Sequence, residues 1–171
     1  MKKGLIIILI SAVSFAALAQ GPVIGKYFDQ LSGDDKFTKV AVSSKMFSLF
    51  TELETGSEEE TEFLKAISKL KGLKIIVADS IGNSASMYKQ ASADISKAGY
   101  EELMSVKDAE ENMMFSITEK NGIVSELIMV VGGKEKFVLL SLYGEIDLKN
   151  ISKIASAMRV NGLDQLKKLD E

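Results

Sequence analysis

The sequence predicts an α+β fold, with a single mixed, largely antiparallel sheet of five or six strands and helices packed on at least one of its faces. Helical periodicity dominates the first half of the chain and is interrupted by two strand-like segments. The second half alternates apolar and polar residues between tight-turn signals, which is typical of an antiparallel meander. The chain of 171 residues is 46% hydrophobic and 26% charged, as a folded globular protein is.

Residues 1–19 have the three parts of a secretory signal peptide. Met1-Lys2-Lys3 is a basic start, residues 4–15 carry no charge, and Ala17-Leu18-Ala19 has the small-x-small form of a cleavage site. The alternative is a retained membrane anchor, but the uncharged stretch is shorter than the roughly 20 residues of a spanning helix. We therefore expect cleavage between Ala19 and Gln20. A single α+β domain over 20–171 would remain, in the periplasm and without a stable membrane anchor.

The first predicted elements are short. A helix is expected over 22–31 because Ile24, Tyr27 and Leu31 recur at helical spacing behind Pro22. A strand is expected over 37–42, where valines alternate with lysine and alanine. Ser43 or Ser44 can then cap a helix whose apolar face extends to residue 53.

A capping box opens the next helix. Ser57 and Glu60 have the spacing at which a serine oxygen accepts from the third amide and the glutamate reaches back to the serine amide. Gly72 is expected to end this helix. The β-branched run over 73–78 predicts an interior strand, and a further helix is expected from Ser84 to its end at Gly99.

The meander follows. Strands are expected over 100–106, 113–118 (half-buried), 123–131 and 137–143, although Glu101 and Glu102 could instead extend the preceding helix. Asn121-Gly122 predicts a two-residue hairpin turn, and Gly132-Gly133 predicts the next reversal. After Gly144, Asp147 is a good N-cap for a closing amphipathic helix that would present Leu148, Ile151, Ile154, Ala155 and Met158.

The last two strands carry apolar residues toward both faces, whereas a sheet with one face in water shows polar residues there. The second face is therefore covered by the protein's own helices, lines a cavity or meets a partner. If alternation continues across the glycine pair, one set of apolar residues shares that face, and we interpret it as a possible binding face. This set is Leu127, Met129, Leu139 and Tyr143.

The composition argues against several classes of function. Without histidine or cysteine, the chain lacks the commonest general base, thiol nucleophiles and the commonest metal ligands. The net charge is −3, and removal of Lys2 and Lys3 would take it to about −5. With one arginine and no basic cluster, the chain is not expected to bind nucleic acid.

Acidic and serine-containing motifs have simpler structural interpretations than catalytic ones. The run from Glu58 to Glu62 could attract a divalent cation, but carboxylates in a first helical turn are favoured by the helix dipole. Glu145 and Asp147 could form a carboxylate pair, but Asp147 is explained as an N-cap. Ser43-Ser44-Lys45 and Ser152-Lys153 lack the Ser-x-x-Lys spacing of known serine–lysine enzymes. We expect no catalytic residue, metal or cofactor.

Methionines recur along the chain and could form an adaptable binding surface, because methionine repacks easily. Alternatively, these methionines are ordinary core residues, and their alternating spacing favours this interpretation. The residues are Met104, Met113, Met114, Met129 and Met158.

Four segments together resemble a family of small exported proteins of Gram-negative bacteria that share a domain of unknown function, number forty-two fifty-two. They are Ser44-Lys45-Met46-Phe47, the stretch Lys71-Gly72-Leu73-Lys74-Ile75-Ile76, the stretch Ile123-Val124-Ser125-Glu126-Leu127, and residues 140–148 running into Ile151-Ser152-Lys153. The resemblance implies export and one domain, and it assigns no activity, cofactor or catalytic residue.

These observations predict an exported, non-enzymatic protein of the cell envelope that binds or associates with a protein. The alternative is a carrier that holds an apolar small molecule between sheet and helices. A hydrolase that works without histidine is the third possibility.

Overall fold

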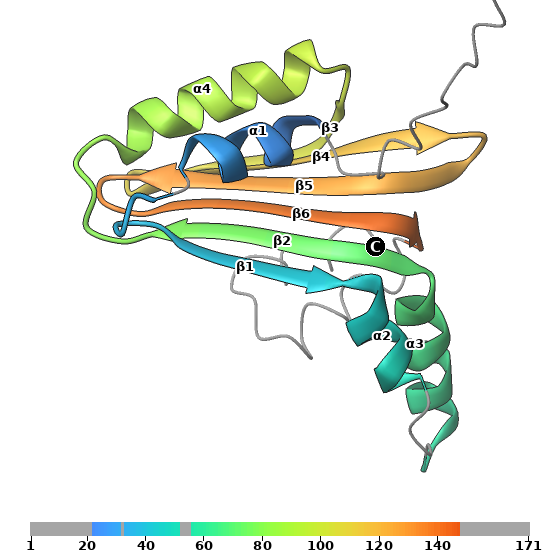
Figure 1. Cartoon of the computed structure of the whole chain (residues 1–171). Helices are drawn as coiled ribbons and strands as arrows, with labels where there is room; N and C mark the ends of the chain where they lie inside the picture. Colours follow the sequence, from blue (N-terminus) through green and yellow to red (C-terminus); the bar gives the residue numbers. More distant parts are fainter. Residues whose placement is uncertain (1–21, 32, 52–55, 148–171) are drawn as a thin grey trace, which may run out of the picture.

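The computed structural model describes residues 22–31, 33–51 and 56–147, which form a six-stranded sheet and four helices (Figure 1). The strand order is β1-β2-β6-β5-β4-β3, and every neighbouring pair is antiparallel. The α+β prediction with a C-terminal meander is confirmed, and the described sheet contains no parallel pair. The elements are α1 Pro22–Gln30, β1 Thr38–Ser43, α2 Ser44–Phe50, α3 Glu58–Ser68, β2 Leu70–Ala78, α4 Ser84–Lys97, β3 Glu101–Lys107, β4 Glu111–Lys120, β5 Ile123–Gly133 and β6 Phe137–Ile146.

Strands β3 to β6 follow one another along the chain and across the sheet, whereas β2 joins this meander only by pairing with β6. The turn between β4 and β5 is made by Asn121 and Gly122, both with positive φ (56° and 79°), as predicted for a two-residue hairpin. Glu101 and Glu102 lie in β3 and do not extend α4.

One face of the sheet packs against α1 and α4, which lie side by side above it in Figure 1. Ile24 of α1 and Ala91 and Ile95 of α4 have no exposed surface. They belong to one core with Leu139 and Val130 of the central strands. The amphipathic pattern of both helices is therefore explained by burial against this face.

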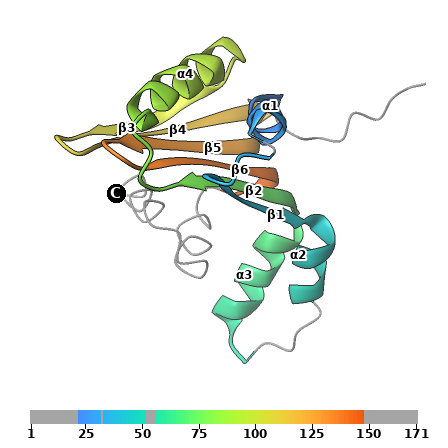
Figure 2. The same ribbon diagram turned by 60° about the vertical axis from the view of Figure 1, so that its left-hand side comes forward.

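The other face carries a second core, to which α2 and α3 contribute from one end of the sheet (Figure 2). Phe47 of α2 and Ile67 of α3 are buried together with Leu73, Phe115 and Leu127 of the sheet. Burial on both faces explains why the central strands are apolar in both directions. It also corrects the expectation that 113–118 is half-buried, because Met114 and Phe115 are buried on opposite faces.

The N-caps predicted for α2 and α3 differ from the structure in detail. The Ser57 side chain accepts from the Glu60 amide at 3.2 Å, but the Glu60 carboxylate accepts from the Gly56 amide (2.7 Å) rather than from the Ser57 amide. Ser43 is the N-cap of α2 without a side-chain capping hydrogen bond. Half of the predicted capping box is therefore confirmed, and the other half is shifted by one residue.

Two predicted glycine breaks are wrong. Gly72 lies inside β2, and α3 has already ended at Ser68. Gly132 and Gly133 are the last residues of β5, and residues 134–136 make the reversal. A Cβ on Gly132 would lie 2.5 Å from the Tyr88 Cβ, so this glycine permits α4 to approach the sheet rather than making a turn.

Several predictions concern residues outside those the structure describes. They are the signal peptide with its Ala19–Gln20 cleavage site, and the closing helix expected after Asp147. Among the described residues, no helix is both long and apolar enough to span a bilayer.

Candidate functional site

The four residues predicted to form one binding face lie on two. Leu127 and Met129 belong to the core with α2 and α3, whereas Leu139 belongs to the core with α1 and α4. The reason is the register: Val130 pairs with Leu139, and Glu126 pairs with Tyr143. Even-numbered residues of β5 therefore share a face with odd-numbered residues of β6, the reverse of the parity assumed from sequence. Three of the four are fully buried, so the set is not one surface.

A buried carboxylate with two hydroxyl partners lies on the α1–α4 face of the sheet. Glu126 of β5 is only 6% exposed. Its Oε1 accepts from the Ser141 hydroxyl of β6 at 2.6 Å, and its Oε2 accepts from the Tyr100 hydroxyl at 2.6 Å. Tyr100 stands between the end of α4 and the start of β3. We call these three residues the Glu126 cluster, which ties α4 to the two central strands.

Burial dominates the acidity of the Glu126 cluster. Burial raises the pKa of Glu126, against the opposing effects of the Ser141 and Tyr100 hydrogen bonds and of Lys74. Burial also raises the pKa of Tyr100, and the hydrogen bond to Glu126 and its charge raise it further. Because each carboxylate oxygen already has a donor, the cluster is satisfied as it stands and has the character of a structural polar network.

We expect Glu126→Gln to remove a pH-dependent component of stability, because glutamine keeps the shape of the side chain and can accept from one hydroxyl and donate to the other, but cannot ionise. The raised pKa means that the folded state binds the proton more tightly than the unfolded state does. The free energy of unfolding of the wild type, relative to the variant, should therefore be greatest below the ordinary glutamate pKa and fall as pH rises through the folded value. Urea unfolding between about pH 4 and pH 8 measures this.

The exposed substitution Glu101→Gln is the control and should not reproduce that fall. A difference in unfolding free energy between the wild type and the Glu126→Gln variant that stays constant across the pH range would contradict the prediction.

A polar hollow of about 290 Å³ lies where the α1–β1 and β2–α4 loops meet. Asp34, Lys36 and Asp79 contribute its charged groups, and Ser80 has a positive φ of 58°. Asp34 also accepts from the Lys36 amide at 3.1 Å, which fixes its own loop. No group of three or more metal-ligating side chains is found in the described part of the chain.

Two of the remaining predicted candidates, Glu60 and Glu145, have structural partners. Glu60 caps α3, and Glu145 forms an ion pair with Lys69. Asp147 follows β6, and the helix that it was expected to cap lies outside the described residues, as does Ser152-Lys153.

Met114 and Met129 are buried, Met104 and Met113 pack against the core, and Met158 is not described.

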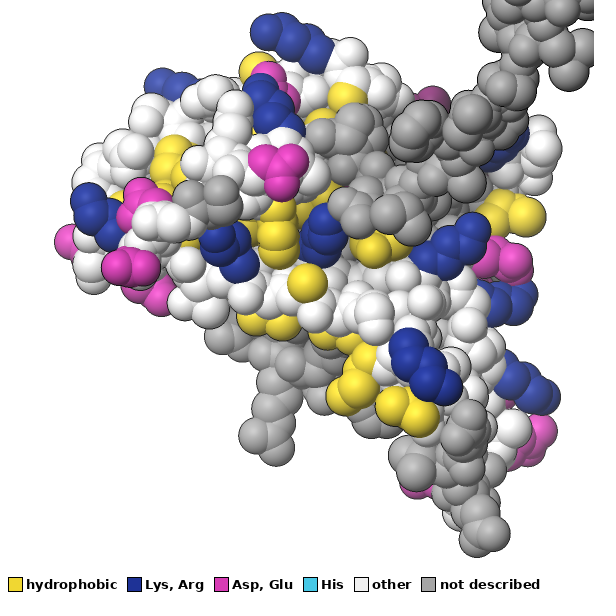
Figure 3. Space-filling model, in the orientation of Figure 1, with side chains coloured by type: hydrophobic (Ala, Val, Ile, Leu, Met, Phe, Trp, Pro, Cys, Tyr) yellow, Lys and Arg dark blue, Asp and Glu magenta, His cyan; other side chains and the backbone are white. Residues whose placement is uncertain are grey.

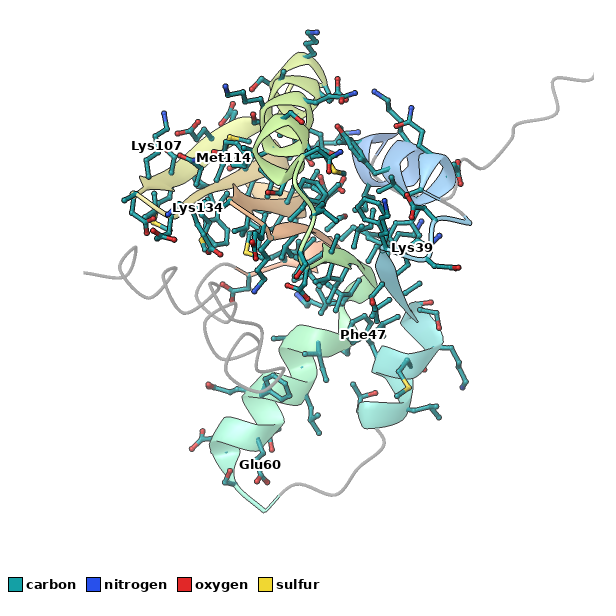
Figure 4. All side chains as sticks on the ribbon, turned by 90° about the vertical axis from the view of Figure 1, so that its left-hand side faces the viewer. Lys39, Phe47, Glu60, Lys107, Met114 and Lys134 are labelled. Atoms are coloured by element: carbon teal, nitrogen blue, oxygen red, sulfur yellow. The ribbon has the colours of Figure 1, made fainter. Side chains whose placement is uncertain are left out.

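An exposed apolar surface lies at the β1 edge of the sheet. Val40 of β1 is 41% exposed, and Met46 and Leu49 of α2 are each 47% exposed. We call these three residues, with the outer edge of β1 that pairs with no other described strand, the β1–α2 surface. Figure 3 shows apolar side chains beside lysines in the lower right of the molecule, where Figure 1 places the end of β1 and α2. Phe47, on the inward side of α2, is buried between that helix and the sheet (Figure 4).

The two edges of the sheet differ in how they are protected. At β3 the pairing is interrupted by an irregularity between Glu102 and Met104, and Glu101 and Lys107 add charge. At β1 the register with β2 is continuous over six pairs. The strand's one charge, on Lys39, is held by a hydrogen bond from Nζ to the Leu31 carbonyl at 3.0 Å. Lys39 and Lys107 mark the two edges in Figure 4. The β1 edge therefore carries one charged side chain and no pairing irregularity, fewer protective features than the β3 edge.

Neither the Glu126 cluster nor the β1–α2 surface was predicted from the sequence. Glu126 is a lone charge in an apolar strand, a signal that could have identified it, but its Tyr100 partner depends on where α4 ends. The sequence indicates Val40 only as part of a strand, because edge position follows from topology.

The resemblance noted in the sequence is confirmed by comparison with known families. A family model described as Domain of unknown function (DUF4252) matches residues 27–154, most of the chain. No curated protein and no solved structure matches the chain.

Proposed function

We propose that this chain, which belongs to the DUF4252 family, is a non-enzymatic association domain of the cell envelope that acts in the periplasm. The observation that carries the proposal is the β1–α2 surface. It combines a free, regular strand edge with three exposed apolar side chains. An edge of this kind is a template for pairing with another chain, and folded proteins normally blunt it.

The chemistry of the polar groups supports association over catalysis. The buried carboxylate of Glu126 already has a partner on each oxygen. The sequence supplies neither histidine nor cysteine to activate a nucleophile. The packing of α1 and α4 favours association over the carriage of an apolar ligand on that face. Ile24 and Ile95 have no accessible surface there, because neighbouring side chains pack closely around them and occupy the space that a ligand would need.

Export is supported by the basic start, the uncharged stretch and the small-x-small site of residues 1–19. The proposal therefore includes removal of these residues and a mature chain that begins at Gln20.

The proposal is tested in a Gram-negative host that exports the chain. We expect N-terminal sequencing of the periplasmic fraction to begin at Gln20. We expect a photo-crosslinking residue at Met46 to form an adduct with another polypeptide chain. Leu49→Glu should abolish the adduct, because a charge is placed in the contact without disturbing the core.

Ile123→Glu is the matched control, since Ile123 is 46% exposed but lies at the start of β5, outside the β1–α2 surface. This variant should retain the adduct. Uncleaved chain in the membrane would overturn the export proposal, and the absence of any adduct at Met46 would overturn the association proposal.

A further inference from the structure

We infer that the partner at the β1–α2 surface is a second copy of this chain, joined by antiparallel pairing of β1 with β1 around a two-fold axis. This inference rests on the proposed function and specifies its partner. Two six-stranded sheets would then become one continuous sheet with β1 strands at its centre.

The first argument is the strand itself. Among the described strands β1 is outermost, with β2 on one side, so one row of its backbone groups is paired with no other described strand. Its six residues pair with β2 without interruption, which leaves the outer edge straight enough to accept another strand. α2 packs against β1 and β2 and lies beneath the end of β1 (Figure 2).

The second argument is charge. Asp34, Asp35 and Lys36 lie two to four residues before β1 and together carry a net charge of −1, and Lys45 lies in the first turn of α2, just after β1 ends. Antiparallel pairing places the acidic start of each strand beside the basic end of the other, twice per dimer. Parallel pairing would bring like charges together at both ends. The charge distribution therefore selects an antiparallel, self-complementary contact.

The third argument is register. Pairing centred on Val40 sets Val40 against its own copy, Lys39 against Ala41, and Thr38 against Val42. Each Lys39 then lies directly opposite an alanine, and the second Lys39 is on the diagonal rather than directly opposite. Val40 and Val42 pair with Ile75 and Leu73 of β2, which pack in the core with α2, so this register continues the same face of the sheet into the second copy. Val40, 41% exposed in one copy, would be buried at the axis.

The test uses the absence of cysteine from the natural chain. Val40→Cys introduces a single thiol at the two-fold axis, where opposite Cα atoms of an antiparallel pair are about 4.5–5.5 Å apart, within disulfide range. We expect mild oxidation of the purified full chain to give a covalent dimer. Val106→Cys, on the exposed β3 edge, is the matched control and should stay monomeric.

A charge exchange tests the orientation. Asp35→Lys and Lys45→Glu should each raise the dissociation constant of the dimer roughly tenfold in sedimentation equilibrium, because each places like charges together. The double variant should restore dimerisation, since the attraction is rebuilt with the signs reversed.

Equal cross-linking of the Val40→Cys and Val106→Cys variants, or a chain that is monomeric at every concentration, overturns the inference. If the Met46 adduct then proves to be with a different protein, the inference fails while the proposed association function stands. If there is no adduct either, both fail.

Discussion

Leu139→Asp is expected to abolish the cooperative fold. Leu139 has no exposed surface and lies in β6, paired with Ile76 on one side and Val130 on the other. The aspartate would place a carboxylate among the apolar side chains of the α1–α4 core, which cannot compensate its desolvation. The cost of several kcal/mol is comparable with the roughly 5–15 kcal/mol stability of an entire domain. Circular dichroism with thermal melting should show loss of the transition.

Two controls separate this effect from a general sensitivity to mutation. Leu139→Met conserves volume and apolarity and should cost less than about 1.5 kcal/mol. Val40→Asp places the same charge on the exposed edge strand and should leave the thermal transition in place. A Leu139→Asp protein that melts like the wild type would disprove the burial of this face.

Gly144→Ala is expected to cost about 2–5 kcal/mol of the free energy of unfolding, the sum of a strained φ and overpacking. Gly144 has a φ of +145° in β6, and a Cβ there would lie 2.6 Å from the Lys69 carbonyl oxygen and 2.7 Å from the Leu70 Cα. Both atoms are backbone atoms where α3 ends and β2 begins, so no side-chain rotation can relieve the clash. The change should be measured by urea unfolding.

Gly122→Ala is the matched control. Gly122 also has a positive φ (79°), but nothing lies within 4 Å of its added Cβ. It should therefore show only the conformational cost of about 1–2 kcal/mol. If both substitutions cost the same, the close approach of β6 to the start of β2 is not what Gly144 provides.

Local signals were sufficient to predict much of the fold. Asn121-Gly122 specifies its hairpin because both positions need positive φ, and Ser57 caps α3 because a hydroxyl satisfies an amide three residues on. Such features depend on neighbours in sequence. They can therefore be read without knowing the rest of the structure.

Features that depend on distant contacts could not be predicted in this way. Gly132 resembles a turn residue, yet its role is set by Tyr88 of α4. The reversal lies at residues 134–136 instead of at the glycine pair, which changes the residues of β6 that pair with those of β5. For this reason Leu139 and Met129 lie on opposite faces of the sheet. The Glu126 cluster shows the same limit, because the glutamate is the one charge in its strand, whereas its partner Tyr100 comes from the connection between α4 and β3.

The pairing of β2 with β6 has a consequence for how the chain folds. β3, β4, β5 and β6 are joined one to the next by short loops. β2, by contrast, pairs with β6, which lies near the end of the described chain. Contacts of such large sequence separation slow folding, since the loop must close before pairing stabilises it. In a chain exported as proposed, the β1 and β2 segments would enter the periplasm before their partner strand was available. Because the sheet would form late, the chain would remain unfolded, as translocation requires, until most of it had been exported.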